Sequence, residues 1–248
     1  TVPICLLHIF IRNKDRIFHW SKHRETNLLV VTTSDQFQEI QQRFRKSKEC
    51  IWNIMGVVLL DEGEKPEAFR RLLEFVHEYD DHMDVGVLGG RVIFHVLADY
   101  GCSDLAYKMI ARPDYPSYGE WLSHGATTLR EQFLQDERFS LNHHFWGDIS
   151  HWFIRHLAGI CYNPRRRGAE ADIRPSFVEQ LTFAEGWHEA PEGKIAVRWE
   201  RTEEGIRLNV QAPEGLYGRI YLPQGYLFAE DRLAVKPLCS GSYAITAG

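Results

Sequence analysis

The spacing of apolar residues changes once along the chain, and this change limits the possible folds more than any other feature. Apolar side chains first recur every three or four residues, as at Phe69, Leu72 and Val76. That period extends over residues 34–164 and predicts amphipathic helices that each have one face to bury. Over residues 169–248, short runs rich in Val, Ile, Tyr and Trp are separated by Gly and Pro, which predicts strands. The sequence therefore predicts a mainly α chain with a β domain.

Capping residues and glycines give the bounds of the expected helices. Ser34 or Asp35 suits the N-cap of a first helix, and the apolar stripe Ile51–Leu59 is expected to form a second. Pro66 suits the first turn of a third helix. The sequence at Gly86–Gly90 then breaks the pattern. Further helices are expected from Val92 to Gly101, from a cap at Ser103 onward, and along a stripe from Trp146 to Ile160.

These patterns divide the chain into three parts. Residues 1–33 are unassigned, although Ile4–Ile11 and Leu28–Thr33 are apolar and β-branched enough for strands. Residues 34–164 are expected to form paired helices packed around a common centre, because that arrangement buries one-sided stripes. Residues 169–248 are expected to form a small antiparallel β-sandwich.

Composition and charge exclude several classes of function. The 248 residues are 44% hydrophobic and 25% charged, which is ordinary for a globular protein, and the formal net charge is −5. Arg165–Arg167 is a short basic cluster that fits a solvated linker, so binding to nucleic acid or to an anionic membrane is not expected. Ile4–Ile11 is too short to span a bilayer and lacks the flanking features of a signal peptide.

The cysteines argue against disulfides and against a zinc–thiolate site. Cys5, Cys50, Cys102, Cys161 and Cys239 are odd in number, far apart, and form no CxxC pair. Free and mostly buried thiols are expected instead, and these favour a reducing compartment.

Two groups of histidines have the spacing of metal ligands on one helical face. These are His144, Asp148 and His151, and the pair His19 and His23. Neither group includes the Glu of a His-Glu-x-x-His motif, and chance together with solvent exposure explains both better. No metal site is therefore expected.

The segment from residue 114 to residue 160 holds the residues best suited to chemistry. It contains Tyr115–Gly119 (YPSYG), Gly125–Glu131 (GATTLRE) and Ser140–Asp148 (SLNHHFWGD). Aromatic faces that stack on sugar rings, and polar groups that fix hydroxyls, are what a sugar site requires. Hydrolysis of a glycosidic bond also requires two carboxyl groups.

These three segments resemble the signature of the α-L-rhamnosidases of glycoside hydrolase family 78. The resemblance begins near Gly56, passes through Leu97–Gly101 and Pro191–Trp199, and ends at about residue 225. It implies part of an (α/α)6 barrel of paired helices followed by a C-terminal β-sandwich. It also implies inverting hydrolysis of terminal non-reducing α-L-rhamnose from a glycan or glycoside, without a cofactor.

The resemblance assigns roles to three residues. Glu131 matches the family's general base, which would activate a water opposite the leaving group, with the two carboxyls roughly 6.5–9.5 Å apart. The alternative for Glu131 is a surface glutamate paired with Arg130 or Arg138. His143 matches a histidine that contacts the sugar; the alternative is a buried histidine satisfied by backbone. Tyr118 could equally line the pocket or pack under the loop.

The chain also departs from the family. No segment resembles the family's general-acid pattern Asp-Cys-Pro-Gln-Arg-x-Glu-Arg, so only the C-terminal half of the barrel is expected. A missing N-terminal half or an oligomeric partner would then cover the open barrel. Arg130 replaces a usual aromatic residue, and would either favour ionised Glu131 or divert it into a salt bridge.

Three functions therefore compete. The first is an α-L-rhamnosidase acting on a rhamnose-containing carbohydrate. The second is a catalytically inactive fragment or sugar-binding remnant of such an enzyme. The third is another paired-helix carbohydrate enzyme, such as a lyase with Tyr118 and His143 in the site, against which Gly125–Glu131 argues.

Overall fold

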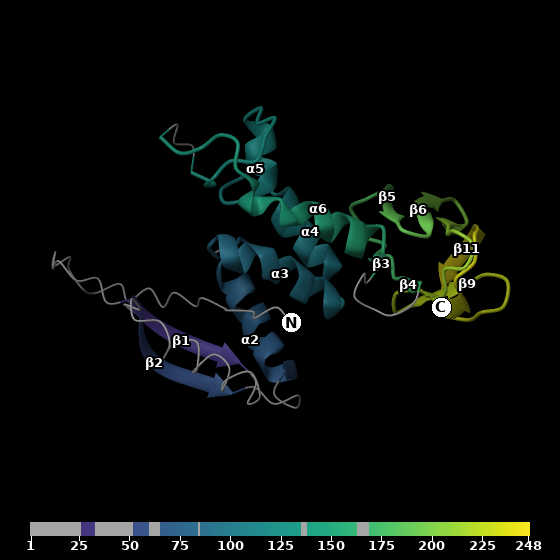
Figure 1. Ribbon diagram of the computed structural model, residues 1–248, viewed down its shortest axis with the longest axis horizontal. Helices are drawn as coiled ribbons and strands as arrows, with labels where there is room; N and C mark the ends of the chain where they lie inside the picture. Colours follow the sequence, from purple (N-terminus) through teal and green to yellow (C-terminus); the bar gives the residue numbers. More distant parts are fainter. Residues whose placement is uncertain (1–25, 33–51, 60–64, 84, 135–137, 163–168) are drawn as a thin grey trace. The chain divides into compact units, whose positions relative to one another are not determined.

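The structure is a computed structural model that describes residues 26–32, 52–59, 65–83, 85–134, 138–162 and 169–248 (Figure 1). The chain divides into two compact units, Thr1–Val92 and Ile93–Gly248. Several features singled out in the sequence lie outside the described residues. They are Ile4–Ile11, His19, His23, Ser34, Asp35, Cys5, Cys50 and Arg165–Arg167.

The first unit contains two parallel strands, β1 (Thr26–Thr32) and β2 (Trp52–Leu59), which lie side by side in Figure 1. The strand expected at Leu28–Thr33 is confirmed as β1. The helix expected over Ile51–Leu59 is wrong, because residues 52–59 form β2. Strands of parallel sheets are commonly apolar on both faces, so their sequences form nearly continuous apolar runs. Periodicity alone does not separate such a run from a buried helix.

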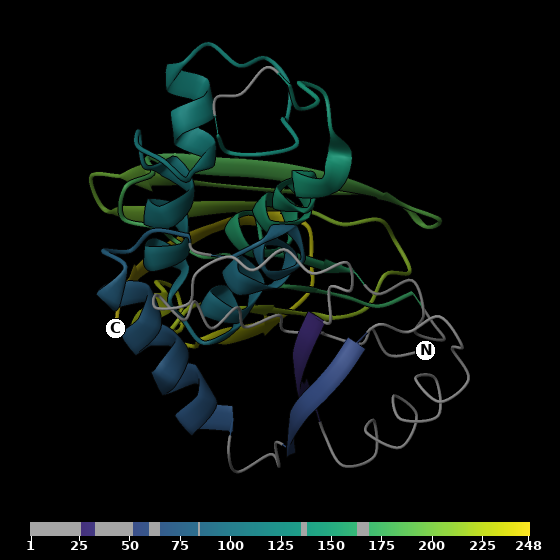
Figure 2. The ribbon, with the colours of Figure 1, turned by 90° about the vertical axis from the view of Figure 1, so that its left-hand side faces the viewer.

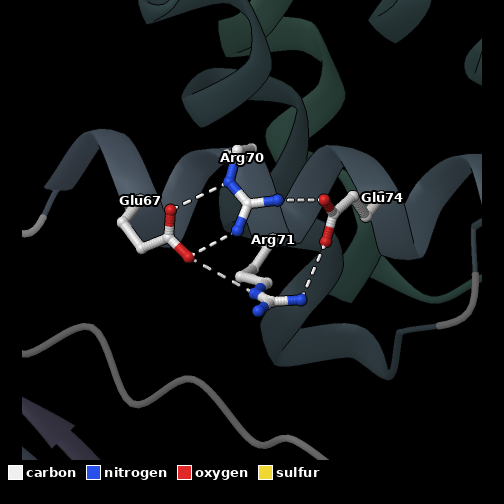
Figure 3. A network of polar contacts seen from close by, with 4 residues as sticks. All are labelled: Glu67, Arg70, Arg71 and Glu74. Carbon is white, nitrogen blue, oxygen red and sulfur yellow. Dashed lines mark hydrogen bonds and ion pairs between the residues drawn. The ribbon is translucent and has the colours of Figure 1, made fainter.

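Helix α2 (Lys65–Glu78) confirms the helix expected to begin at Pro66. Its exposed face carries a network of Glu67, Arg70, Arg71 and Glu74 (Figure 3). The Arg70 guanidinium donates to both carboxylate oxygens of Glu67, at 2.8 and 2.6 Å, and these bonds lower the pKa of Glu67. The spacings of three and four residues support the helix locally, but such exposed ion pairs contribute little to stability.

Helix α3 (Val87–Asp99) begins earlier than expected. The break expected at Gly86–Gly90 is wrong for most of that segment, because Gly89 and Gly90 lie in the first turn of α3. Helix α4 (Ser103–Ala111) follows as expected, but Ser103 is its first residue and Cys102 its N-cap. The Ser103 hydroxyl instead shares a hydrogen bond of 2.8 Å with Ser176.

The stripe from Trp146 to Ile160 forms several short elements instead of one long helix. A 3-10 turn η2 (His144–Trp146) leads into α6 (Asp148–Trp152), and this continues as the π turn η3 (Phe153–Leu157). Ile160 already belongs to strand β3 (Ile160–Tyr162). Upstream, the short helix α5 (Tyr118–Ser123) is capped by Ser117, whose hydroxyl accepts from the Glu120 amide at 2.9 Å.

The C-terminal part is a β-sandwich, as expected. One sheet has the strand order β10-β8-β4-β3 and the other β5-β6-β7-β11-β9, in which β5 and β6 run side by side as long green strands in Figure 2. The four-stranded sheet is mixed, since β4 and β8 are parallel. The strands are β4 (Ala171–Ile173), β5 (Phe183–Ala190), β6 (Gly193–Thr202), β7 (Gly205–Gln211), β8 (Arg219–Tyr221), β9 (Tyr226–Phe228), β10 (Val235–Pro237) and β11 (Gly241–Ala247).

Both sheets contribute to one apolar core, and alternation along the strands explains how. In β6 the side chains of Ile195, Val197 and Trp199 are buried, while the residues between them are partly exposed. Ile173 and Ile220 reach the same core from the other sheet. Period-two burial of this kind is what a sandwich strand with one solvated face should show.

The last helical turn connects directly to the sandwich. The Trp199 indole N–H donates to the Leu157 carbonyl at 2.8 Å, and the Arg174 amide donates to the Gly159 carbonyl at 2.7 Å. Gly159 has φ of 85°, and a Cβ there would lie 2.2 Å from the Pro175 nitrogen, so only glycine fits.

Two general properties follow from the described residues. None of their helices combines the length and the apolar character required to cross a bilayer. Cys102, Cys161 and Cys239 have free thiols. The expectation of buried thiols is wrong for Cys239, which is exposed; the other two are half-buried.

Replacing Trp199 with Ala should lower the free energy of unfolding by about 3–5 kcal/mol, because a fully buried ring is lost and a cavity is left. Chemical denaturation followed by circular dichroism measures this change. The control is Trp187→Ala, at a ring that is 53% exposed, and it should cost less than about 1 kcal/mol. Equal losses in the two variants would contradict this account of the core.

Candidate active site

Two of the three segments singled out for sugar chemistry, Gly125–Glu131 and Ser140–Asp148, lie antiparallel to each other. The His143 amide donates to the Leu129 carbonyl at 2.7 Å, and the Glu131 amide donates to the Ser140 carbonyl at 2.9 Å. The Thr128 hydroxyl also donates to the Leu141 carbonyl. The structure thus brings the Gly125–Glu131 segment and the Asn-His segment together through backbone bonds, in a region without regular strands.

Glu131 is half-buried and held from two sides. Its Oε2 accepts a hydrogen bond of 3.1 Å from the Ser140 amide, and its backbone carbonyl accepts one of 3.0 Å from the Trp146 indole. A backbone amide is a fixed donor, so it orients the carboxylate without neutralising it. A carboxylate with one such bond keeps acceptor capacity for a water molecule.

His143 is half-buried beside Glu131's segment. Its ring lies edge-on to Phe145, with centroids 4.0 Å apart. The buried Nδ1 has no hydrogen-bond partner among the residues that the structure describes. A buried polar atom left without a partner costs free energy, so such an atom often marks a place where a ligand or water binds.

Tyr118 lies inside an aromatic cluster. Its side chain is 8% exposed, and its hydroxyl donates to the Trp146 carbonyl at 3.0 Å. Its ring meets Trp121 and Phe133 edge-on, each at 5.5 Å. Burial raises the pKa of Tyr118, and the charge of Asp148 adds to this. Of the two roles left open by the sequence, packing under the loop fits this environment.

Trp146 connects Tyr118 to Glu131, which the sequence did not reveal. Its carbonyl accepts from Tyr118, and its indole N–H donates to the Glu131 carbonyl. Helical spacing identified Trp146 only as a core residue, and it is indeed buried. The contribution of the Ser140 amide was also missed, because a backbone donor leaves no mark in the sequence.

A second polar cluster lies between α3 and the α6–η3 segment. His95 Nε2 is 2.9 Å from Asp148 Oδ2, and His95 Nδ1 is 2.9 Å from His156 Nε2. The His151 ring lies 5.0 Å from that of His95. Burial lowers the pKa of His156 to about 3, and the charge of His95 acts in the same direction. Asp148 and His151 were paired in the sequence, but His95 was not recognised as their neighbour.

His95, Asp148 and His151 are the group that could hold a metal ion among the described residues. One ligand atom from each lies within 4.8 Å of the others. His144, which shares their helical spacing, instead packs its ring against Phe145 at 5.1 Å.

Comparisons with known proteins identify the family of the chain. A family model described as the bacterial alpha-L-rhamnosidase 6 hairpin glycosidase domain matches residues 47–157. A second, the bacterial alpha-L-rhamnosidase C-terminal domain, matches residues 170–228. The chain belongs to the α-L-rhamnosidase family. Its helical part corresponds to the six-hairpin glycosidase domain and its sandwich to the C-terminal domain, so the expected fold class is confirmed.

Individual α-L-rhamnosidases align with most of this chain, but the aligned region is a small part of their own length. One from Alteromonas sp. (strain LOR) is 32% identical over 68% of this chain and 19% of its own length. One from Streptomyces avermitilis is 28% identical over 77% of this chain and 20% of its own length. The chain thus spans about one fifth of the length of these relatives.

Two solved structures have a similar fold. The α-L-rhamnosidase from Dictyoglumus thermophilum gives a TM-score of 0.65 at 26% identity, covering 74% of this chain and 23% of its own. The α-L-rhamnosidase of Streptomyces avermitilis, solved in complex with L-rhamnose, gives a TM-score of 0.64 at 26% identity. The match covers 74% of this chain and 20% of that one.

Replacing Tyr118 with Phe should lower the free energy of unfolding at neutral pH by about 1–3 kcal/mol, because the buried Trp146 carbonyl loses its donor. The pKa of Tyr118 is raised in the folded protein. The stability that the neutral phenol contributes is therefore complete below the unfolded pKa of about 10, and it is lost progressively as the pH rises from there toward the folded pKa. Urea denaturation at several alkaline pH values should therefore show a steeper loss in the parent than in the variant. Parallel dependence of stability on pH in the parent and in the variant would contradict the burial of the Tyr118 hydroxyl.

Proposed function

We propose that this chain contributes the general base and a sugar contact to an inverting glycoside hydrolase that removes terminal non-reducing α-L-rhamnose. Family membership supports glycoside hydrolysis, and the antiparallel pairing of the Glu131 and His143 segments supports a shared site. This pairing is the observation that favours the proposal most, because it brings together the two segments that carry the residues marked for catalysis and binding by the family resemblance.

In this mechanism Glu131 accepts a proton from a water molecule as the water oxygen attacks the anomeric carbon. The bond from that carbon to the glycosidic oxygen breaks, and a carboxylic acid protonates the departing oxygen, so the configuration inverts. The Ser140 amide holds the Glu131 carboxylate through Oε2, and Trp146 fixes its backbone. Both contacts preserve the orientation that a base needs.

His143 is proposed to hold a sugar hydroxyl. A neutral imidazole donates through one ring nitrogen and accepts through the other, and the buried Nδ1 is suited to either task. A relative from Streptomyces avermitilis has been solved with L-rhamnose, which supports rhamnose as the sugar to test. Tyr118 is proposed to support the site from beneath, through Trp146, without touching the sugar.

The second candidate function is a sugar-binding module without catalytic activity. It is favoured by the lack of any segment resembling the family's general-acid pattern in these 248 residues. In the first proposal, the acid comes from a further portion of the protein or from a partner chain that completes the barrel.

Glu131→Gln should reduce release of nitrophenol from p-nitrophenyl α-L-rhamnoside by about 100-fold or more, because the variant side chain cannot accept the proton of water. This substrate is chosen because nitrophenolate leaves without much help from an acid, so the base can be tested even if the acid lies elsewhere. Nuclear magnetic resonance of the first product should show the inverted anomer.

The control is Glu204→Gln, at an exposed glutamate between β6 and β7, which should match the parent. Release that survives in Glu131→Gln would contradict the role of Glu131. No release from any of these proteins, together with rhamnose binding, would favour the sugar-binding module.

His143→Ala should weaken L-rhamnose binding about 5- to 150-fold, the effect of losing one buried hydrogen bond of roughly 1–3 kcal/mol. Isothermal titration calorimetry measures the change in Kd, and denaturation curves check that the variant is folded. His188→Ala, on β5, is the control and should bind as the parent does. Unchanged affinity in His143→Ala would show that the ring does not contact the sugar.

A further inference from the structure

The cluster of His95, Asp148 and His151 has the composition and spacing of a metal site. Its three ligand atoms lie within 4.8 Å of one another, and His95 Nε2 is already 2.9 Å from Asp148 Oδ2. A tetrahedral zinc ion with bonds of about 2.0–2.2 Å places its ligand atoms roughly 3.3 Å apart. His151 is exposed, and its ligand atom lies within 4.8 Å of the other two, so it needs to move by at most about 1.5 Å to reach that distance.

A buried hydrogen bond links the two helices that carry the ligands. The Trp152 indole, fully buried, donates to the Phe94 carbonyl at 2.9 Å. Phe94 is adjacent to His95, and Trp152 is adjacent to His151. The backbone is therefore fixed beside two of the three ligands, and a preorganised site loses less entropy when an ion binds.

His156 completes the arrangement around His95. A histidine that binds a metal through one ring nitrogen usually donates its other N–H to a neighbouring acceptor, which fixes the tautomer and the ring orientation. With an ion on Nε2, His95 Nδ1 carries the proton and donates to His156 Nε2, which lies 2.9 Å away. His156 then acts as a positioning residue and does not ligate the ion.

One cation lies near the site. The Arg155 guanidinium interacts electrostatically with His151 and His156 and would repel a metal ion, so direct ligation must supply the affinity.

We infer that His95, Asp148 and His151 form a binding site for one divalent first-row transition metal ion, with Zn²⁺ as the ion to test. Two imidazoles and one carboxylate are ligands that suit zinc, and three protein ligands leave one position for water. The site joins α3 to α6 and uses none of the residues proposed for rhamnose hydrolysis. It is therefore independent of that function.

The experiment is a titration of the untagged 248-residue protein with ZnCl₂, followed by calorimetry. We expect one ion per chain, and an upward shift of Tm in saturating Zn²⁺, because an ion that binds only the folded state stabilises it. His151→Gln, at an exposed ligand, should lower the affinity at least tenfold while the protein remains folded. His156→Gln should lower it about 10- to 100-fold, as loss of the partner of a ligating histidine does.

The matched control is His77→Gln. His77 lies on α2, which carries none of the proposed ligands. Its Nδ1 is 2.6 Å from the carboxylate of Asp81. This variant should bind Zn²⁺ as the parent does. Co²⁺ gives a second measurement, since a site of nitrogen and oxygen ligands produces a visible spectrum without the near-ultraviolet band of a cobalt–thiolate bond.

Three outcomes would overturn the inference. The first is no saturable binding, which would mean that His95, Asp148 and His156 form only a hydrogen-bonded chain. The second is equal affinity in the parent and in His151→Gln. The third is a thiolate band in the Co²⁺ spectrum, which would place the ion on cysteine.

Discussion

The junction at Leu157–Ile160 is the constraint on which the rest of the second unit depends. Leu157 gives its carbonyl to the buried Trp199, Gly159 turns the chain in a left-handed conformation, and Ile160 enters the four-stranded sheet within one residue. Because only Ala158 and Gly159 separate helix from sheet here, the sandwich core and the α6–η3 segment that carries Asp148 and His156 are parts of one packed body.

Around this body, the polar side chains of interest are held mostly by backbone groups. The Ser140 amide orients Glu131, the Trp146 carbonyl receives Tyr118, and the Phe94 carbonyl receives Trp152. Large aromatic rings fill the space between these bonds, and close packing makes their positions hard to change. The proposed catalytic residues lie in irregular chain, so this aromatic support replaces the rigidity that a strand or helix would give.

The sequence predicted the sandwich and α2 well because their signals are local: alternation with Gly and Pro turns, and a proline-initiated helix. It failed at residues 52–59, where an apolar run has no distinguishing period, and at residues 146–160, where helical spacing continues through a π turn into a strand. In the site, the motifs led to Glu131 and His143. The Ser140 amide and the approach of His95 to Asp148 could not be predicted, because backbone donors and contacts across 53 residues have no local signature.

The π turn of η3 acts as a phase shift along the helix axis. The Ala158 amide reaches back five residues to Phe153, so one extra residue is accommodated without leaving the helix. In an uninterrupted α-helix each residue advances by about 100°. The extra residue therefore changes the direction of every side chain that follows relative to those before it, and a single deletion within residues 153–155 would turn His156 away from His95 without altering either residue.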